Sequence, residues 1–179
     1  MLSTTDKVID HPSKEWEISG VIENDDGILG TKYTDDLKGT AKADFIDAKN
    51  GDDIINGGLG NDTLVGGLGR DRFVFDTVLG INNVDNIIDF ESTYDRIYLK
   101  ATLFSALGAQ VTEDELLQDF HVKAEAQDGN DYLIYDNHSG KLYFDADGNG
   151  KGQWVQIAKI VGDTGFALTN FDVTDFIII

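Results

Sequence analysis

The amino-acid sequence predicts an all-β protein. We expect a parallel β-roll of nine-residue repeats, followed by a β-rich C-terminal cap with one or two short helices. Three observations support this fold class. Residues 21–74 divide into consecutive rows of nine, every row has Asp in its sixth column, and every row has a large apolar residue in its eighth. A fixed short period indicates structural units that stack on their neighbours.

The rows are VIENDDGIL, GTKYTDDLK, GTAKADFID, AKNGDDIIN, GGLGNDTLV and GGLGRDRFV. The sixth column holds Asp26, Asp35, Asp44, Asp53, Asp62 and Asp71, and the eighth holds Ile28, Leu37, Ile46, Ile55, Leu64 and Phe73. The last three residues of a row would form a short strand whose middle side chain points inward. We expect one row to give half a turn of the coil, so that row n stacks on row n+2.

Glycine and aspartate bring oxygen atoms together in these rows. Gly at the first, second and fourth positions permits positive φ angles, so that backbone carbonyls can aim at one point. The Asp adds a carboxylate to that point. Carbonyl and carboxylate oxygens are the ligands of Ca²⁺, which takes six to eight of them. We therefore expect Ca²⁺ between stacked rows, with Asp53 and Asp71 as one pair and Asp44 and Asp62 as the other.

Only the last three rows have Gly in the fourth column, which Tyr33 and Lys42 occupy in rows two and three. Metal sites are therefore expected chiefly in rows four to six. Their candidate loop residues are Lys49, Gly51, Gly57, Gly58, Leu59, Gly60, Gly66, Gly67, Leu68 and Gly69.

The rows resemble the repeats-in-toxin (RTX, haemolysin-type) nonapeptide, Gly-Gly-x-Gly-x-Asp-x-apolar-x. GGLGNDTLV and GGLGRDRFV are consecutive, near-perfect copies, and AKNGDDIIN precedes them. The resemblance implies a β-roll that binds Ca²⁺. A disordered Gly/Asp-rich segment is the alternative, but it would not keep both an Asp column and an apolar column.

The segment after the rows reads D-x-I-x-D-F and then D-x-I-x-L. It resembles the segment that follows the roll in serralysin-type secreted proteases. The resemblance implies that Asp85 and Asp89 complete the last calcium sites, with Asp95 as a weaker candidate. The alternative, that these are solvent-facing strand residues, stays open.

The residues that follow this segment predict the helix and strands of the C-terminal cap. Thr112 and Glu115 have the spacing of a capping box and precede the apolar residues Leu116, Leu117 and Phe120, which predicts a short helix. Residues 132–135 and 141–144 predict a hairpin, and residues 154–157 a further strand.

The stretch Asp145–Gly150 matches the first half of an EF-hand loop. Gln156 stands where the loop would need a bidentate Glu, so a tight turn explains these residues equally well.

The chain ends in Asp175 followed by four apolar residues. We expect a final strand packed into the core. This ending resembles the uncleaved C-terminal signal of type I secretion substrates, in which an acidic residue precedes apolar ones. The chain end can be both a secretion signal while unfolded and a packed strand once folded. The predicted organisation is a leader or N-terminal cap at 1–20, the roll at 21–75, and a cap carrying the secretion signal at 76–179.

Composition and motif content argue against several classes of function. The net charge is −19, which argues against nucleic acid as a partner. Cysteine is absent, so neither a disulfide nor a thiolate metal site is expected. No apolar run has transmembrane length, and the first residues lack the apolar region of a cleaved signal peptide. His11, His121 and His138 lie far apart and no HExxH motif is present, so no catalysis is predicted.

These observations predict a secreted, extracellular module that folds on binding Ca²⁺ after export by type I secretion machinery. The alternative is a carbohydrate-binding accessory module, since alginate epimerases carry RTX modules that resemble this one and help to bind the polysaccharide. That function would need a basic or aromatic strip at outward positions, where Lys38, Lys42, Arg70 and Arg72 are the candidates.

Overall fold

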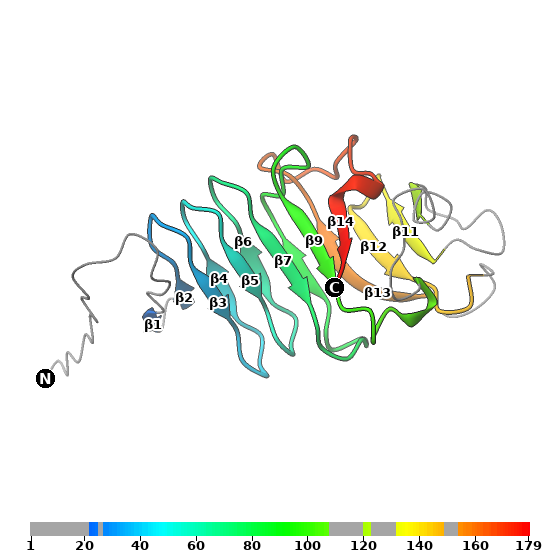
Figure 1. Cartoon of the computed structure of the whole chain (residues 1–179), viewed down its shortest axis with the longest axis horizontal. Coiled ribbons are helices and arrows are strands. Elements are labelled where there is room, and N and C mark those ends of the chain that lie inside the picture. The colour runs from blue at the N-terminus through cyan, green and yellow to red at the C-terminus, as the bar shows by residue number, and fades with distance from the viewer. Residues whose placement is uncertain (1–21, 25–26, 108–119, 123–131, 149–153) are drawn as a thin grey trace, which may run out of the picture.

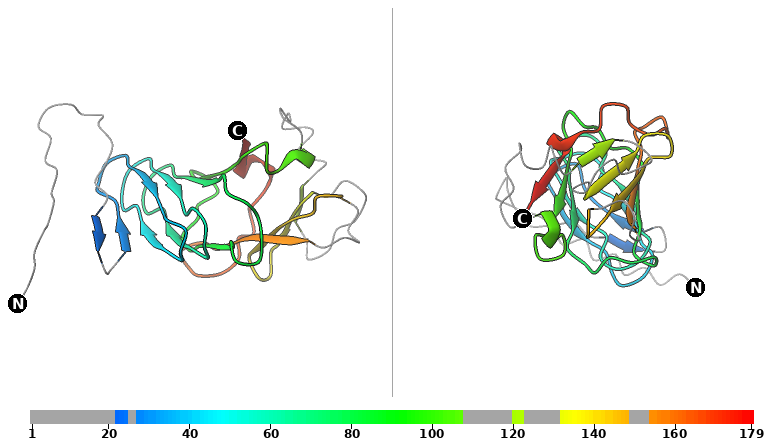
Figure 2. Two further views of the ribbon diagram at one scale, coloured as in Figure 1. Left: turned by 90° about the horizontal axis from the view of Figure 1, so that it is seen from below. Right: turned by 90° about the vertical axis from the view of Figure 1, so that its right-hand side faces the viewer.

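A computed structural model describes residues 22–24, 27–107, 120–122, 132–148 and 154–179. Two sheets face each other across a flattened coil, whose turns follow one another along the long axis of the molecule (Figures 1 and 2). Each nine-residue row contributes one short strand, and successive rows place their strands in opposite sheets.

The first sheet runs in the order β1-β2-β4-β6-β8-β13-β12-β11-β10. Its strands are β1 (Ile22–Asn24), β2 (Gly27–Leu29), β4 (Phe45–Asp47), β6 (Thr63–Val65), β8 (Asp85–Ile87), β13 (Val155–Ile160), β12 (Lys141–Phe144), β11 (Leu133–Asp136) and β10 (Phe120–Val122). The second sheet runs in the order β14-β9-β7-β5-β3. Its strands are β14 (Phe176–Ile178), β9 (Arg96–Leu99), β7 (Arg72–Phe75), β5 (Ile54–Asn56) and β3 (Asp36–Lys38).

The strands of the roll are parallel and in register with the repeat. Leu37 pairs with Ile55 and Ile55 with Phe73 in one sheet, and Ile46 pairs with Leu64 in the other. These side chains of the eighth column are buried between the sheets, which confirms the predicted half-turn per row and the inward column. Burial of one such side chain contributes about 1.5–3 kcal/mol.

The stacking continues after the last row. Strand β8 pairs with β6, and β9 pairs with β7, although the connections are longer than a repeat. Ile87 and Ile97 extend the two inward columns and are fully buried. The segment that follows the repeats thus adds a further turn to the roll.

The cap closes the C-terminal end of the coil. Strands β11 and β12 form the predicted hairpin, β13 pairs with β12 and with β8, and β14 packs beside β9. Phe171 lies at the centre of the aromatic contacts, with its ring centroid 4.4 Å from that of Tyr135, 5.5 Å from Phe90 and 5.3 Å from Phe176. This aromatic cluster joins the last strand of the chain to the roll.

The helical content is small. Two 3₁₀ turns, η1 (Ser105–Leu107) and η2 (Val173–Asp175), are present among the described residues. The helix predicted from Thr112 and Glu115 falls on residues 108–119, which lie outside the described ones. Phe120, expected at its end, belongs instead to β10.

The EF-hand-like stretch is described only up to Gly148. Residues 145–148 form a turn after β12, and Gly148 has a φ of 62°. Gln156 lies in β13. None of the described helices is long and apolar enough to cross a membrane.

Candidate metal centre

Two columns of aspartates run along the roll, one on each edge. The backbone N–H of Asp53 donates to Oδ1 of Asp71 at 2.9 Å, and that of Asp44 donates to Oδ1 of Asp62 at 2.8 Å. Asp35 repeats this contact with Asp53 at 2.7 Å. The aspartates paired from the sequence are therefore neighbours in the stack, each 18 residues from the next.

Asp85 and Asp95 continue the two columns past the last row. Oδ1 of Asp85 accepts the N–H of Asp62 at 3.2 Å, and Oδ1 of Asp95 accepts that of Asp71 at 3.0 Å. The resemblance made Asp95 a weaker candidate than Asp85 and Asp89, whereas the structure places Asp95 in the column, 24 residues after Asp71 instead of 18. The available signal was the triplet Asp-x-apolar, which Asp95 begins just as Asp71 does.

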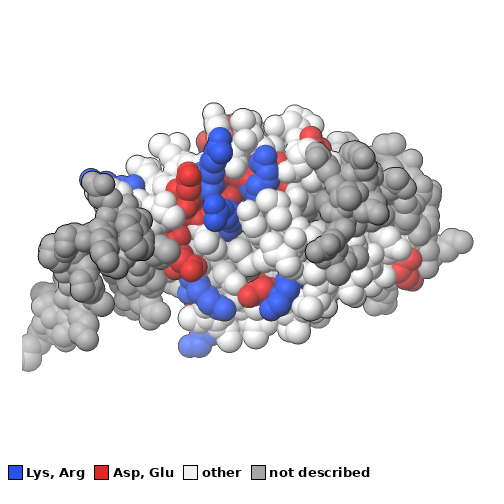
Figure 3. All heavy atoms as spheres, viewed as in Figure 1, with Lys and Arg blue, Asp and Glu red and all other residues white. Residues whose placement is uncertain are grey.

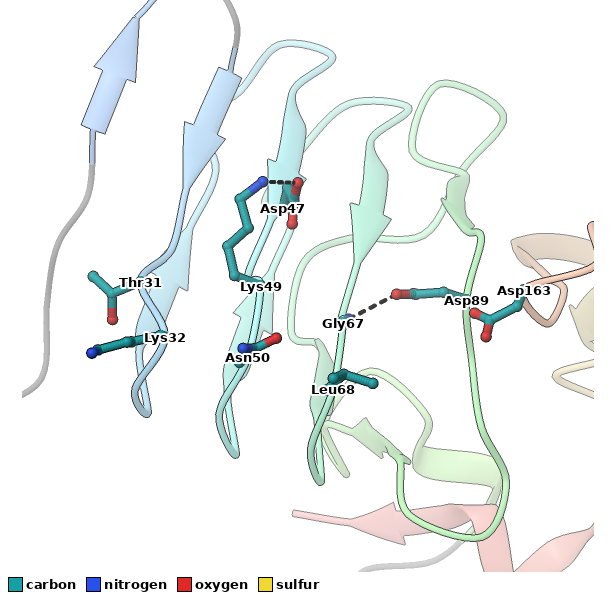
Figure 4. Close-up of a pocket in the computed structure, with 9 residues that line it drawn as sticks. All are labelled: Thr31, Lys32, Asp47, Lys49, Asn50, Gly67, Leu68, Asp89 and Asp163. Carbon is teal, nitrogen blue, oxygen red and sulfur yellow. Dashed lines mark hydrogen bonds and ion pairs between the residues drawn. The ribbon is translucent and has the colours of Figure 1, made fainter.

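Asp89 lies outside the columns. Its two carboxylate oxygens accept the N–H groups of Gly66 at 2.9 Å and Gly67 at 2.7 Å, so it caps the loop of the sixth row (Figure 4). Two N–H donors on one carboxylate hold the Gly-Gly turn in place. The structure thus places Asp89 at the loop of row six, where its carboxylate faces backbone N–H groups, and its role as a calcium ligand stays a prediction.

The loops of rows four to six share one backbone geometry. Their second position has positive φ in Lys49, Gly58 and Gly67, and so does their fourth position in Gly51, Gly60 and Gly69. A Cβ atom on Gly67 or Gly69 would lie 1.6 or 1.8 Å from the carbonyl oxygen of Lys49 or Gly51 in the stacked row. Backbone carbonyls of one row therefore point at the next, into space that only glycine leaves open.

Lys49 is the exception to the glycine pattern, with a φ of 79° in a residue that carries a side chain. This conformation costs an L-residue roughly 1–2 kcal/mol. Its ammonium group forms an ion pair with Asp47 (Figure 4). Both residues line an open cavity of about 550 Å³ along the loop edge, together with Thr31, Lys32, Asn50, Gly67, Leu68, Asp89 and Asp163.

The second carboxylate oxygen, Oδ2, is left unsatisfied by the described residues in the aspartates of rows four to six. Oδ2 of Asp53, Asp62 and Asp71 is buried and has no hydrogen-bond partner within the described part of the chain. A buried polar atom without a partner destabilises the fold by about 1–3 kcal/mol, and more if it is charged. In Asp62 and Asp71 this oxygen lies against the first glycine of its own row, 2.3 and 2.5 Å from where a Cβ would stand.

Burial also changes the acidity of these groups. Desolvation raises the pKa of Asp53 to about 7 and that of Asp71 to about 6, and the charges of neighbouring aspartates act in the same direction. Desolvation likewise raises the pKa of Asp85 and of Asp95 to about 7. Without a cation, the ionised columns are therefore electrostatically unfavourable.

This donor set fits a hard cation. Among the described residues, no cluster of three or more His, Cys, Asp or Glu side chains could hold a metal. The oxygens available in these loops are backbone carbonyls, with buried carboxylate oxygens beside them. Ca²⁺ accepts such mixtures of carbonyl and carboxylate oxygens, whereas Zn²⁺ requires clustered His, Cys or carboxylate side chains.

Comparison with known proteins agrees with this geometry. Residues 29–64 and 38–73 match the model of the RTX calcium-binding nonapeptide repeat (four copies). No curated protein matches the chain.

Among solved structures, the chain is similar to the solution structure of the AlgE6R3 subunit from the Azotobacter vinelandii mannuronan C5-epimerase. The TM-score is 0.35 at 20% sequence identity, covering 87% of this chain and 88% of that one. The rows at residues 29–73 are RTX calcium-binding nonapeptide repeats, and Ca²⁺ is their ligand.

Proposed function

We propose that this chain is a folding and secretion module of an extracellular protein, which leaves the cell unfolded through type I secretion machinery and folds on binding Ca²⁺ outside. The observation that carries the proposal is the set of buried carboxylate oxygens of Asp53, Asp62 and Asp71 that lack a hydrogen-bond partner among the described residues. They lie in loops whose carbonyls face the stacked row. The geometry therefore offers oxygen donors that the polypeptide itself leaves unused.

The carboxylates of Asp53, Asp62 and Asp71 would hold the ions, together with loop carbonyls of rows four to six. Asp44 would hold neighbouring turns together through its N–H, which donates to Asp62. Asp85 would close one column, and Asp89 would keep the last Gly-Gly turn in shape. Bound Ca²⁺ would supply positive charge among carboxylates that burial otherwise destabilises.

Binding and folding would be coupled. The chain carries 33 acidic and 14 basic residues, and this excess of like charge opposes a compact state. An ion that binds only the folded state stabilises it by mass action. Extracellular calcium modules have affinities of about 10⁻⁴–10⁻³ M, so that such sites fill outside the cell and stay empty at cytosolic calcium.

The C-terminal segment supports the export part of the proposal. Strand β14 is parallel to β9, and Phe176 is buried in the aromatic cluster. Phe176 would therefore be accessible to a receptor before the chain folds and hidden afterwards. The division into a leader at 1–20, a roll at 21–75 and a cap at 76–179 stays a prediction.

Circular dichroism of the metal-stripped protein tests the folding switch. We expect a disordered spectrum without Ca²⁺ and a β-type spectrum at about 1 mM Ca²⁺, with binding heat in calorimetry. Mg²⁺ serves as the control ion, because it demands smaller octahedral sites. An unchanged spectrum together with no binding heat would exclude the switch.

Export requires a separate experiment. In a bacterium that expresses a type I exporter, the full chain should reach the medium, and a chain ending at Thr174 should stay inside. Equal export of the two chains would remove the secretion signal from the proposal and leave the calcium switch intact.

A second candidate function is the binding of an acidic polysaccharide. On the outer face of the second sheet, Arg72 lies beside Arg96 and Val74 lies beside Tyr98, and Lys38 is exposed on β3. Figure 3 shows Lys and Arg side chains over the middle of the face that Figure 1 views, with Asp and Glu side chains beside them.

Calorimetry with alginate oligomers in saturating Ca²⁺ distinguishes the two functions. If the strip binds the polymer, Arg72→Glu should weaken binding, whereas Lys159→Glu, exposed on the other sheet, should not. Absence of binding heat with the wild-type protein would exclude this second function.

A further inference from the structure

Two threonines satisfy the carboxylates of the second and third rows. Oδ2 of Asp35 accepts the backbone N–H of Thr31 at 2.5 Å and its hydroxyl at 3.0 Å. Oδ2 of Asp44 accepts the same two groups of Thr40, at 2.6 and 2.9 Å. In each case the donor is the second residue of the row and the acceptor is the sixth, so the loop is closed within its own row.

The same oxygen, Oδ2, has no hydrogen-bond partner in rows four to six within the described part of the chain. There the second position holds Lys49, Gly58 and Gly67, all with positive φ, and none of them donates to the Asp of its row. Thr31 and Thr40 do not have positive φ. Rows with Thr at position two therefore have a hydrogen-bonded Oδ2, whereas rows with a residue of positive φ at position two have an Oδ2 that the described residues leave without a partner.

We propose that Thr31 and Thr40 take the place of calcium at the carboxylates of rows two and three, so that the N-terminal turns of the roll are held without the ion. This inference rests on the proposed calcium-dependent folding. An N–H and an O–H donor supply the positive charge that Oδ2 would otherwise take from a cation. A Ca²⁺ ion would have to displace two hydrogen bonds to reach that atom, which disfavours binding.

The consequence is a roll with two kinds of turn. Turns two and three are closed by the polypeptide, and turns four to six are left for the metal. Upstream of rows four to six, the chain would then carry a short calcium-independent segment on which the metal-bound rows stack.

The test converts a closed row into an open one. Thr40→Gly combined with Lys42→Gly turns the third row into GGAGADFID, which has the glycine pattern of row five. The number of ions taken up on folding is measured from the slope of ln K for folding against ln [Ca²⁺], and by equilibrium dialysis. We expect both numbers to rise by about one ion per chain.

Thr40→Ser is the matched control, since it keeps the hydroxyl and the N–H and should leave the ion count unchanged. An unchanged count in the double-glycine variant would overturn the proposal, and so would a variant that stays unfolded at saturating Ca²⁺, because the ion should replace the lost bonds. If the wild-type protein itself shows no calcium dependence, the proposed function fails as well, so the two failures are distinguishable.

Discussion

At the scale of the residue, each aspartate of the sixth column has two separate tasks. Its backbone N–H donates to Oδ1 of the aspartate one turn later, as from Asp35 to Asp53 and from Asp53 to Asp71, and so holds the stack together. Its Oδ2 is either bonded within its own row, as in Asp35, or buried without a partner among the described residues, as in Asp71. In the proposed function, an aspartate is thus structural in one row and a ligand in another without any change in its stacking.

Replacing these aspartates by Asn separates the two tasks. Asp71→Asn removes charge from an unpartnered oxygen, so the Kd for Ca²⁺ should rise about tenfold or more, which corresponds to about 1.4 kcal/mol. Asp35→Asn is the control in the same column and should change the calcium affinity little. Calorimetric titration measures both, and equal losses would contradict the distinction between the rows.

The glycines of the fourth position are a second feature at this scale. Gly69 has a φ of 148°, and an added Cβ would lie 1.8 Å from the carbonyl oxygen of Gly51. Gly69→Ala should therefore destabilise the calcium-bound protein by at least the roughly 1–2 kcal/mol of a left-handed L-residue.

Gly80→Ala is the control for this substitution, because no atom lies within 4 Å of its added Cβ. Its effect should stay within about 0.5 kcal/mol. Urea denaturation in saturating Ca²⁺ gives both values, and a tolerated alanine at Gly69 would show that the rows do not pack as closely as described.

At the scale of the element, the C-terminal strand closes the roll. Strand β14 lies beside β9, and its backbone pairing aligns Phe176 with Ile97 at the end of the inward column. The ring centroid of Phe176 lies 5.2 Å from that of Phe120 and 5.3 Å from that of Phe171. The last strand therefore covers apolar surface that an open coil would expose.

Truncating this side chain tests the capping role. Phe176 is 6% exposed, so Phe176→Ala should destabilise the calcium-bound fold by about 3–5 kcal/mol. Ile179→Ala changes a residue that is 53% exposed and should have an effect within about 0.5 kcal/mol. Thermal unfolding in Ca²⁺ measures the two, and similar stabilities would mean that β14 is dispensable for the roll.

At the scale of the whole molecule, the acidic columns determine how the calcium-free protein responds to pH. Burial raises the pKa of Asp53, Asp71, Asp85 and Asp95 from 3.8 to about 6 or 7. A raised carboxyl pKa means that the folded state binds protons more tightly than the unfolded state. The associated stability is complete below pH 3.8 and is lost as the pH rises through about 7.

Metal-stripped protein should therefore become more folded as the pH is lowered from 7.5 towards about 5, provided that no Ca²⁺ is present. In saturating Ca²⁺ the trend should reverse, since protons compete with the ion for the same oxygens. Far-ultraviolet circular dichroism at a series of pH values measures both trends. A calcium-free protein that loses structure on mild acidification would contradict the raised pKa values.

The sequence by itself determined the roll. A nine-residue period with an apolar residue at a constant position predicts the strands, their inward side chains and the stacking of row n on row n+2. The hairpin and the packed final strand also followed from local patterns. These features depend on neighbours within one or two repeats, so a single sequence is enough to predict them.

Only the tertiary structure decided which aspartate oxygens have a partner. Asp95 joins a column after a 24-residue gap, and Asp89 reaches the N–H groups of Gly66 and Gly67 from another turn. Thr31 and Thr40 look like ordinary departures from the glycine pattern until their hydroxyls are seen on Asp35 and Asp44. The physical reason is that satisfaction of a buried oxygen depends on the three-dimensional placement of donors, which periodicity does not encode.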